Sequence, residues 1–130
     1  MSNVFLDILV VNYNTASLLA PMFDALRHSS GVENARYLVV DNASVDNSIE
    51  RFADVCPEAL LVVNKANVGF GRANNQLVEH LQGKYALLLN TDAFVAADTL
   101  SKTLDYMEAH PDCGVLGVRL VGREGDLQPS

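Results

Sequence analysis

The sequence has few cysteines and no long hydrophobic segment, and each of these absences excludes a class of protein. Cys56 and Cys113 lie far apart in unrelated contexts. They fit neither a disulfide framework nor a zinc site, so we expect reduced thiols in or near the core of a cytoplasmic protein. No segment approaches the roughly 18 consecutive apolar residues of a membrane span. Residues 1–4 do not open a basic-then-apolar signal peptide.

Positive charge is also scarce, because Lys and Arg total 9 and Asp and Glu total 16, which gives a formal net charge of −7. Such a protein lacks the cationic surface of non-specific nucleic-acid binding, so we expect no nucleic-acid partner. The same charge repels a phosphate-bearing ligand unless a divalent cation or helix N-termini neutralise it locally. No cluster of Lys and Arg could neutralise the phosphate instead. A phosphate site in this protein therefore requires a divalent cation or a helix N-terminus.

Short apolar runs alternate with longer amphipathic stretches along the chain, which has 130 residues and is 49% hydrophobic. This length and composition suffice for one domain with its own core. The apolar runs cover residues 4–11, 37–40, 60–63 and 85–89, with a weaker fifth run at 114–118. Because each run is nearly continuous, it predicts a strand buried on both faces, as in a parallel sheet.

Apolar residues at helical spacing separate these runs. The stripes lie within residues 18–26, 49–53, 73–81 and 97–107. Strand and helix alternate four times before a final strand, which predicts right-handed βαβ crossovers. We therefore expect an α/β fold with an open, mostly parallel, doubly wound sheet. Three histidines fall near the expected helix C-termini, where the helix dipole explains them structurally: His28, His80 and His110.

Polar residues follow the four stronger runs at the point where each strand ends. They are Asn12, Asp41, Asn64 and Asn90. The carboxyl ends of parallel strands meet at one edge of the sheet, where open α/β sheets bind their ligands. Part of this pattern serves helix capping, by Asn14 or Thr15 for the first helix and by Ser44 or Asp46 for the second. Capping does not require amides and carboxylates after every strand, so we predict a ligand site at this edge.

A glycine-containing turn leads into the third expected helix at residues 67–75. Its glycines allow the backbone to approach a ligand closely. The segment is not the dinucleotide fingerprint, because it follows the third strand and has Asn74 where the last glycine belongs. A tight turn against the sheet is the simpler alternative, but it does not explain the adjacent Asn74 and Asn75.

Asp92 follows the fourth strand and is the candidate metal ligand. A nucleoside diphosphate leaves more readily when Mg²⁺ or Mn²⁺ binds its phosphate oxygens and neutralises their charge. Magnesium keeps several waters and needs only one or two protein carboxylates, so a single Asp suffices.

Together these motifs resemble family 2 glycosyltransferases, inverting enzymes of the GT-A type, and above all the bacterial rhamnosyltransferase-like branch. The similar segments are residues 10–14, 40–48, 67–75, 88–92 and 117–130, in the family's order. The resemblance implies that residues 1–130 form the nucleotide-sugar-binding part of a GT-A domain. It implies, for the whole protein, transfer of a sugar, rhamnose in this branch, to a saccharide or lipid-linked acceptor with inversion. Such transfer belongs to cell-surface polysaccharide biosynthesis.

The resemblance also assigns a nucleoside pocket. Asn12 and Tyr13 would line the base and ribose beside Asn14, with Tyr13 stacking on the base. Asp41 would accept a hydrogen bond from the imide N–H of uracil or thymine, which favours a dTDP- or UDP-linked donor.

Residues of the later motifs would hold the sugar, the diphosphate and the metal. Four of them would wall the pocket or reach a phosphate: Asn67, Gly71, Arg72 and Asn74. Asn90 and Asp92 occupy the family's Asp-x-Asp position, with Asp92 as the ligand of Mg²⁺ or Mn²⁺.

Two departures from the family's pattern bear on these roles. Asn90 replaces the first acidic residue of the Asp-x-Asp motif, and Thr91 replaces a proline common in this branch, so we expect modest metal affinity. Family members continue well beyond this length and carry the general base and the acceptor site there. We therefore expect a truncated domain with the acceptor half absent and no catalytic residue in this chain. The general base is expected beyond Ser130, so the chain alone should transfer little sugar.

Other functions use similar sheets. A flavodoxin-like signalling module would need an acidic pair after the first strand and an Asp after the third, where this chain has residues 12–14 and Asn64. A nucleotidyltransferase would carry a glycine-rich basic loop after the first strand, which residues 13–16 do not provide. A non-catalytic nucleotide-binding domain stays open. For the whole protein we expect a cytoplasmic location, or peripheral association with the inner face of the membrane.

Overall fold

The computed structural model describes residues 5–30, 32–92 and 97–114. Its strands are β1 (Leu6–Asn12), β2 (Ala35–Asp41), β3 (Leu60–Val63) and β4 (Tyr85–Asn90). Its helices are α1 (Ala16–Arg27), α2 (Ser48–Val55), α3 (Phe70–Leu77) and α4 (Thr99–Ala109), with a short 3₁₀ helix η1 (Val78–His80) after α3. The four stronger runs are therefore strands, as predicted.

Three expectations from the sequence fall outside the described residues. The fifth run, residues 114–118, lies outside them apart from Gly114, and the family-like segment 117–130 lies outside them entirely. Ser130, beyond which the general base is expected, lies outside them as well. The fifth strand, the general base and the acceptor half therefore stay predictions.

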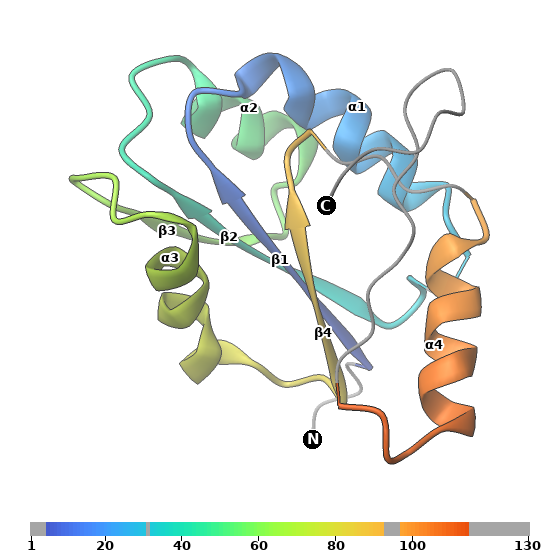
Figure 1. Ribbon diagram of the computed structural model, residues 1–130. Helices are drawn as coiled ribbons and strands as arrows, with labels where there is room; N and C mark the ends of the chain where they lie inside the picture. The colour runs from blue at the N-terminus through green and yellow to red at the C-terminus, as the bar shows by residue number, and fades with distance from the viewer. Residues whose placement is uncertain (1–4, 31, 93–96, 115–130) are drawn as a thin grey trace.

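The strands form one parallel sheet in the order β3-β2-β1-β4 (Figure 1). The register aligns the strand ends, because Asn12 pairs with Asp41 and Val11 pairs with Asn90. Asp41 in turn pairs with Val63, the last residue of β3. The predicted α/β class and the open parallel sheet are confirmed, and the polar residues after the strands reach one edge.

Helices cover both faces of the sheet, which confirms the doubly wound arrangement. On one face α1, α2 and α4 pack over alternate residues of the strands, and α3 packs on the other face (Figure 1). Phe23 of α1 centres the larger core, with its ring 5.6 Å from Tyr37 and 6.0 Å from Phe52, both edge-to-face. Ala73 and Leu77 of α3 form the smaller core over β1 and β2. Both faces of the central strands are buried, so their apolar runs are continuous.

A buried carboxylate holds the sheet edge opposite the candidate site. Asp7 of β1 is 0% exposed. Its Oδ2 accepts 2.7 Å hydrogen bonds from the backbone N–H groups of Gln82 and Gly83, and its Oδ1 lies 3.3 Å from Arg36 Nε. A side chain at Gly83 would stand 3.0 Å from the backbone of Phe5 and Leu6, so this turn passes tightly over the start of β1. These contacts fix the connection from η1 into β4.

The positions of the cysteines and histidines agree with the sequence predictions. Cys56 is buried and Cys113 is half-buried. Burial raises the pKa of the Cys56 thiol to about 12, so this group stays protonated. Each histidine lies at the C-terminal end of a helix, as predicted. Among the described residues, no helix has both the length and the apolar character needed to cross a membrane.

Candidate functional site

Two residues of the predicted nucleoside pocket form a buried pair at the carboxyl edge of the sheet. Asn12 and Asp41 are both 0% exposed. Asn12 Nδ2 donates to Asp41 Oδ1 over 2.8 Å, and the other carboxylate oxygen accepts from the Ser44 backbone N–H over 3.0 Å. Each oxygen of a carboxylate keeps a second lone pair in such an arrangement. Here the pair joins two strand ends, and its contact with a nucleobase remains a prediction.

The loops after β1 and β2 are joined by hydrogen bonds. Asn14 has a φ of +53°, and its side-chain Oδ1 accepts from Val45 N over 2.8 Å. Its own N–H donates to Ser44 Oγ over 2.9 Å. Ala43 in the second loop has a φ of +65°, a left-handed conformation that L-residues with a side chain adopt at a cost. Because unfavourable backbone conformations concentrate at functional sites, these two residues support the prediction of a site at these loops.

Asp46 caps two helices at once, which corrects the predicted capping scheme. Its Oδ2 accepts from Ala16 N, the first residue of α1, over 3.1 Å, and its Oδ1 accepts from Ser48 N, the first residue of α2, over 3.0 Å. Asn14 and Thr15, predicted to cap α1, make no side-chain cap. Hydrogen bonds lower the Asp46 pKa, chiefly that from the Ser48 hydroxyl and then those from the backbone. The sequence predicted Asp46 as a cap of α2 only. Its contact with Ala16 spans 30 residues of sequence, and such a contact leaves no local signal.

Thr91 and Thr15 connect the end of β4 to this buried pair. Thr91 is buried, and its Oγ1 lies 2.8 Å from Thr15 Oγ1. Thr15 Oγ1 lies 2.5 Å from Asn12 Oδ1. Thr91 thus has a defined hydrogen-bond partner in Thr15. The proline that is common at this position in the family branch has no hydroxyl, so the resemblance could not predict this contact.

A second amide network, centred on Asn42, holds the turn before α3. Asn42 is 2% exposed, and its Oδ1 accepts from Asn64 Nδ2 over 3.0 Å and from Val68 N over 3.2 Å. Asn64 also exchanges two hydrogen bonds with Gln76 of α3. Asn64, which had no predicted role beyond leading into this turn, therefore positions α3. Sequence reasoning missed Asn42, although it stands next to Asp41 in a motif rich in amides.

The start of α3 presents the predicted sugar and phosphate residues. Gly69 has a φ of +87°, and Asn67 Oδ1 accepts from its N–H over 2.9 Å. Gly71 and Arg72 are exposed in the first turn. Asn74 is only 5% exposed. A helix N-terminus carries unpaired N–H groups that favour an anion, so this turn suits a phosphate.

Asn74 carries an unsatisfied buried acceptor. Its Nδ2 donates to the carbonyl oxygen of Phe70 over 3.2 Å, while its Oδ1 has no hydrogen-bond partner among the described residues. Such an atom costs about 1–3 kcal/mol, so native proteins normally supply it with a donor. A ligand hydroxyl or a water is the chemistry that this oxygen accepts.

An exposed layer lies beyond the buried one. Tyr13 is 49% exposed, and Asn14, Asn90 and Asp92 are exposed as well. In the part of the chain that the structure describes, no three His, Cys, Asp or Glu side chains gather into a metal cage. Asp92 and Asn90 offer hard oxygen atoms, which fit a magnesium or manganese ion held mainly by phosphate and water. They do not fit a cation enclosed by protein ligands.

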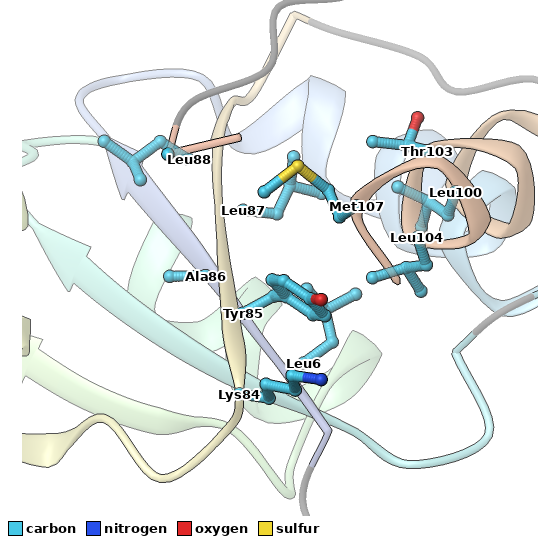
Figure 2. A pocket seen from close by; sticks show the side chains of 11 residues that line it. Leu6, Lys84, Tyr85, Ala86, Leu87, Leu88, Leu100, Thr103, Leu104 and Met107 are labelled. Carbon is cyan, nitrogen blue, oxygen red and sulfur yellow. The ribbon is translucent and has the colours of Figure 1, made fainter. Parts of the chain in front are cut away.

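A cavity of about 480 Å³ lies elsewhere, between β4 and α4 (Figure 2). Figure 2 shows Leu87, Leu104 and Met107 in its lining, where the side chains of strand and helix face one another. Apolar side chains dominate this lining. It offers few donors to a diphosphate, so the polar edge, not this cavity, is the candidate site.

The fold and the polar edge define a class of protein that comparison with known proteins identifies. The family model for glycosyl transferase family 2 matches residues 7–129. The chain belongs to glycosyl transferase family 2.

Two curated relatives support this assignment. An uncharacterized glycosyltransferase of Haemophilus influenzae is 28% identical over 109 residues, which cover 75% of this chain and 44% of that protein. An uncharacterized protein of Sinorhizobium fredii is 28% identical over 116 residues, which cover 85% of this chain and 13% of that protein. The chain therefore spans less than half the length of either relative.

Solved structures share the GT-A fold. A mannosyltransferase of Pyrobaculum calidifontis, in complex with GDP-Man and Mn²⁺, superposes with a TM-score of 0.70 at 26% identity, over 78% of this chain and 32% of that one. S. aureus TarS 1–349 in complex with UDP-GlcNAc superposes with a TM-score of 0.71 at 18% identity, over 83% of this chain and 32% of that one. The second likeness is one of fold alone.

Proposed function

We propose that the carboxyl edge of this sheet binds a nucleotide diphosphate sugar together with Mg²⁺ or Mn²⁺, as the donor site of a glycosyltransferase. The division of the edge into two layers carries this proposal. A buried layer around Asn12 and Asp41 fixes the loops, and an exposed layer around Tyr13 and Asp92 is left for a ligand. Family membership supplies the reaction class.

Each part of the donor has a matching feature. The exposed ring of Tyr13 offers a face for base stacking. The family resemblance favours a dTDP- or UDP-linked donor through a hydrogen bond from the imide N–H of uracil or thymine to Asp41. Because Asp41 is 0% exposed, this contact requires the loop at Ser44 to move when the base binds. The start of α3, with Gly71 and Arg72, suits the diphosphate, and Asn74 Oδ1 suits a sugar hydroxyl.

The proposed reaction is a direct displacement at the anomeric carbon. An acceptor hydroxyl oxygen forms the new bond to that carbon, the bond to the diphosphate oxygen breaks, and the hydroxyl proton passes to a carboxylate base. Attack opposite the leaving group inverts the configuration. A divalent cation, when bound, neutralises the leaving diphosphate. The rhamnosyltransferase-like motifs favour rhamnose as the sugar and a saccharide or lipid-linked acceptor.

We propose that the 130-residue chain alone binds the donor but transfers little sugar. It spans about a third of the solved glycosyltransferases that it resembles. No described carboxylate of the edge is free of a structural or metal role, since Asp41 and Asp46 hold loops and Asp92 is the proposed metal ligand. Robust transfer by the purified chain would contradict this part of the proposal.

The metal role of Asp92 is tested by calorimetric titration of UDP, dTDP and GDP, each with and without Mn²⁺. Asp92→Asn should abolish the gain in affinity that Mn²⁺ gives and leave metal-free binding unchanged. Asp54→Asn is the matched control, because Asp54 is an exposed carboxylate on α2, away from the edge. An unchanged response to Mn²⁺ in Asp92→Asn would exclude Asp92 as the ligand.

A further inference from the structure

The hydrogen bonds at the carboxyl edge have only one consistent direction. Asp41 is a carboxylate and only accepts, so the Nδ2 of Asn12 must face it and the Oδ1 of Asn12 must face Thr15. The Asn12 oxygen also only accepts, so Thr15 donates its single hydroxyl proton there. Thr91 must then donate its hydroxyl proton to Thr15 Oγ1. The chain of donors runs from Thr91 through Thr15 and Asn12 to Asp41.

Helix capping does not account for this arrangement. Thr15 is the N-cap residue of α1, a position where a threonine hydroxyl usually accepts from the helix backbone. Here it makes no such bond. The Thr15 hydroxyl is thereby left for Asn12 and Thr91.

The chain of hydrogen bonds joins the two functional ends of the edge. Paired β4 ends at Asn90, opposite Val11, and the turn with Asp92 follows directly. The Thr91 hydroxyl links this turn to β1 through its hydrogen bond with Thr15, which in turn bonds to Asn12. The hydrogen bond between Asn12 and Asp41 then links β1 to β2. The bonds of such a chain polarise one another, so they act as one unit.

We propose that Thr91 and Thr15 are positioning residues that couple the metal and diphosphate end of the donor site to its nucleoside end. The proposal rests on the proposed donor site. The hydroxyl of Thr91 holds the Asp92 turn in register with the loops that receive the base. Binding of the nucleoside then favours the turn geometry that binds Mn²⁺, and the reverse follows by linkage.

The test measures how strongly Mn²⁺ improves nucleotide affinity, and not activity. Calorimetry gives the dissociation constants of UDP, dTDP and GDP with and without Mn²⁺, and of UMP, dTMP and GMP without it, for each variant. Thr91→Val removes the hydroxyl, keeps the branched shape and leaves the Thr15–Asn12 bond intact. We expect the improvement by Mn²⁺ to fall about fivefold, the equivalent of one hydrogen bond, with monophosphate affinity unchanged.

Two further variants separate coupling from stability. Thr91→Ser keeps the hydroxyl, so the improvement by Mn²⁺ should match that of the wild type. Thr103→Val removes a comparable hydrogen bond within α4, from Thr103 Oγ1 to the carbonyl oxygen of Thr99 over 2.7 Å, and should leave the coupling intact. Where Thr91→Val unfolds, Thr91→Cys weakens the same bond with a smaller loss of polarity and should give a smaller fall in the same direction.

Several results would overturn the proposal. They are an unchanged improvement by Mn²⁺ in Thr91→Val, a fall of monophosphate affinity by the same factor as that of the diphosphates, and a loss of coupling in Thr91→Ser. If the wild type binds none of UDP, dTDP and GDP, the proposed donor site fails and the coupling with it. Binding by the wild type with undisturbed coupling in Thr91→Val refutes the coupling alone.

Discussion

At the scale of single residues, the carboxyl edge contains backbone conformations and a buried polar atom that are unfavourable in free energy. Asn14 and Ala43 have left-handed backbones, and Asn74 buries an oxygen without a donor among the described residues. Such costs persist where the surrounding structure fixes them, and they concentrate at functional sites. Each cost can be removed by one substitution.

Ala43→Gly should stabilise the protein. Glycine removes the clash of a side chain at a φ of +65°, against a smaller gain in unfolded-chain entropy, so we expect the free energy of unfolding to rise by about 0.5–1 kcal/mol. Urea unfolding measures the change. Ala53→Gly in the exposed part of α2 is the control, and it should lose about 1 kcal/mol because its backbone is helical. A lower free energy of unfolding in Ala43→Gly than in the wild type would show that the backbone of Ala43 is not strained.

Asn74→Leu should separate stability from binding. The apolar side chain removes the unsatisfied oxygen, so the free energy of unfolding should rise by about 1 kcal/mol, while nucleotide-sugar affinity falls. Unfolding in urea and titration with UDP-sugar give the two values. Asn75→Leu, at the exposed neighbour, should change both only slightly. A clear loss of stability in Asn74→Leu would mean that a structural water already satisfies this oxygen.

Asp46→Ala should cost stability in a pH-dependent way. Loss of both helix caps should lower the free energy of unfolding by about 1–2 kcal/mol at pH 7. Because the pKa of Asp46 is lowered in the folded state, its contribution is complete above its unfolded pKa of about 4 and disappears as pH falls through the folded value.

The measurement for Asp46 is urea unfolding of wild type and variant across a pH series from 7 down to the acid limit. Asp54→Ala, on the same helix, should show no comparable difference. A gap between wild type and Asp46→Ala that stays constant into acid would exclude the carboxylate as its source.

At the scale of the elements, β1 connects the two edges of the sheet. Asn12 joins it to the site at one end, and Asp7 joins it to the turn before β4 at the other. Both side chains are fully buried, so each strand end is held by a satisfied polar group.

Asp7→Asn should be strongly destabilising. The amide nitrogen of Asn presents donors toward the N–H groups of Gln82 and Gly83 or toward Arg36, so at least one of these groups loses its hydrogen bond to the buried position 7. We expect a loss of about 3 kcal/mol in the free energy of unfolding, measured in urea. Asp105→Asn, at an exposed site on α4, is the control. A loss below about 1 kcal/mol would show that the network contributes little.

The elements were predictable from the sequence because their signals are local. The strands follow from continuous apolar runs, and the aligned register follows from their parallel order. The α4 stripe was predicted from Ala97, but the helix begins at Thr99 after Asp98. Helix boundaries depend on caps, which apolar spacing does not show.

The detail of the site was less predictable because its contacts are not local. Asp46 caps α1 from a loop 30 residues away, and Thr91 bonds to Thr15 across 76 residues. The sequence showed which polar residues lie at the carboxyl edge of the sheet. Which of them are buried and which are exposed could be learned only from the strand register and the packing in the structure. Asn12 and Asp41, predicted as pocket residues, turn out to be buried, whereas Tyr13 and Asp92 are open to a ligand.

At the scale of the whole molecule, the chain places its polar chemistry at one edge and an apolar cavity beside β4 (Figure 2). A net charge of −7 makes an unassisted diphosphate site unfavourable, so the proposed function depends on a divalent cation and on the start of α3.

The most direct test of the donor site is a map of amide resonances during titration with UDP, dTDP or GDP and Mg²⁺, followed by replacement of Mg²⁺ with paramagnetic Mn²⁺. We predict shifts for Tyr13, Ser44 and Gly71, and the strongest broadening by Mn²⁺ at Asp92. Absence of shifts with every nucleotide, or shifts confined to the cavity residues Leu104 and Met107, would contradict the assignment of the carboxyl edge as the nucleotide-sugar site.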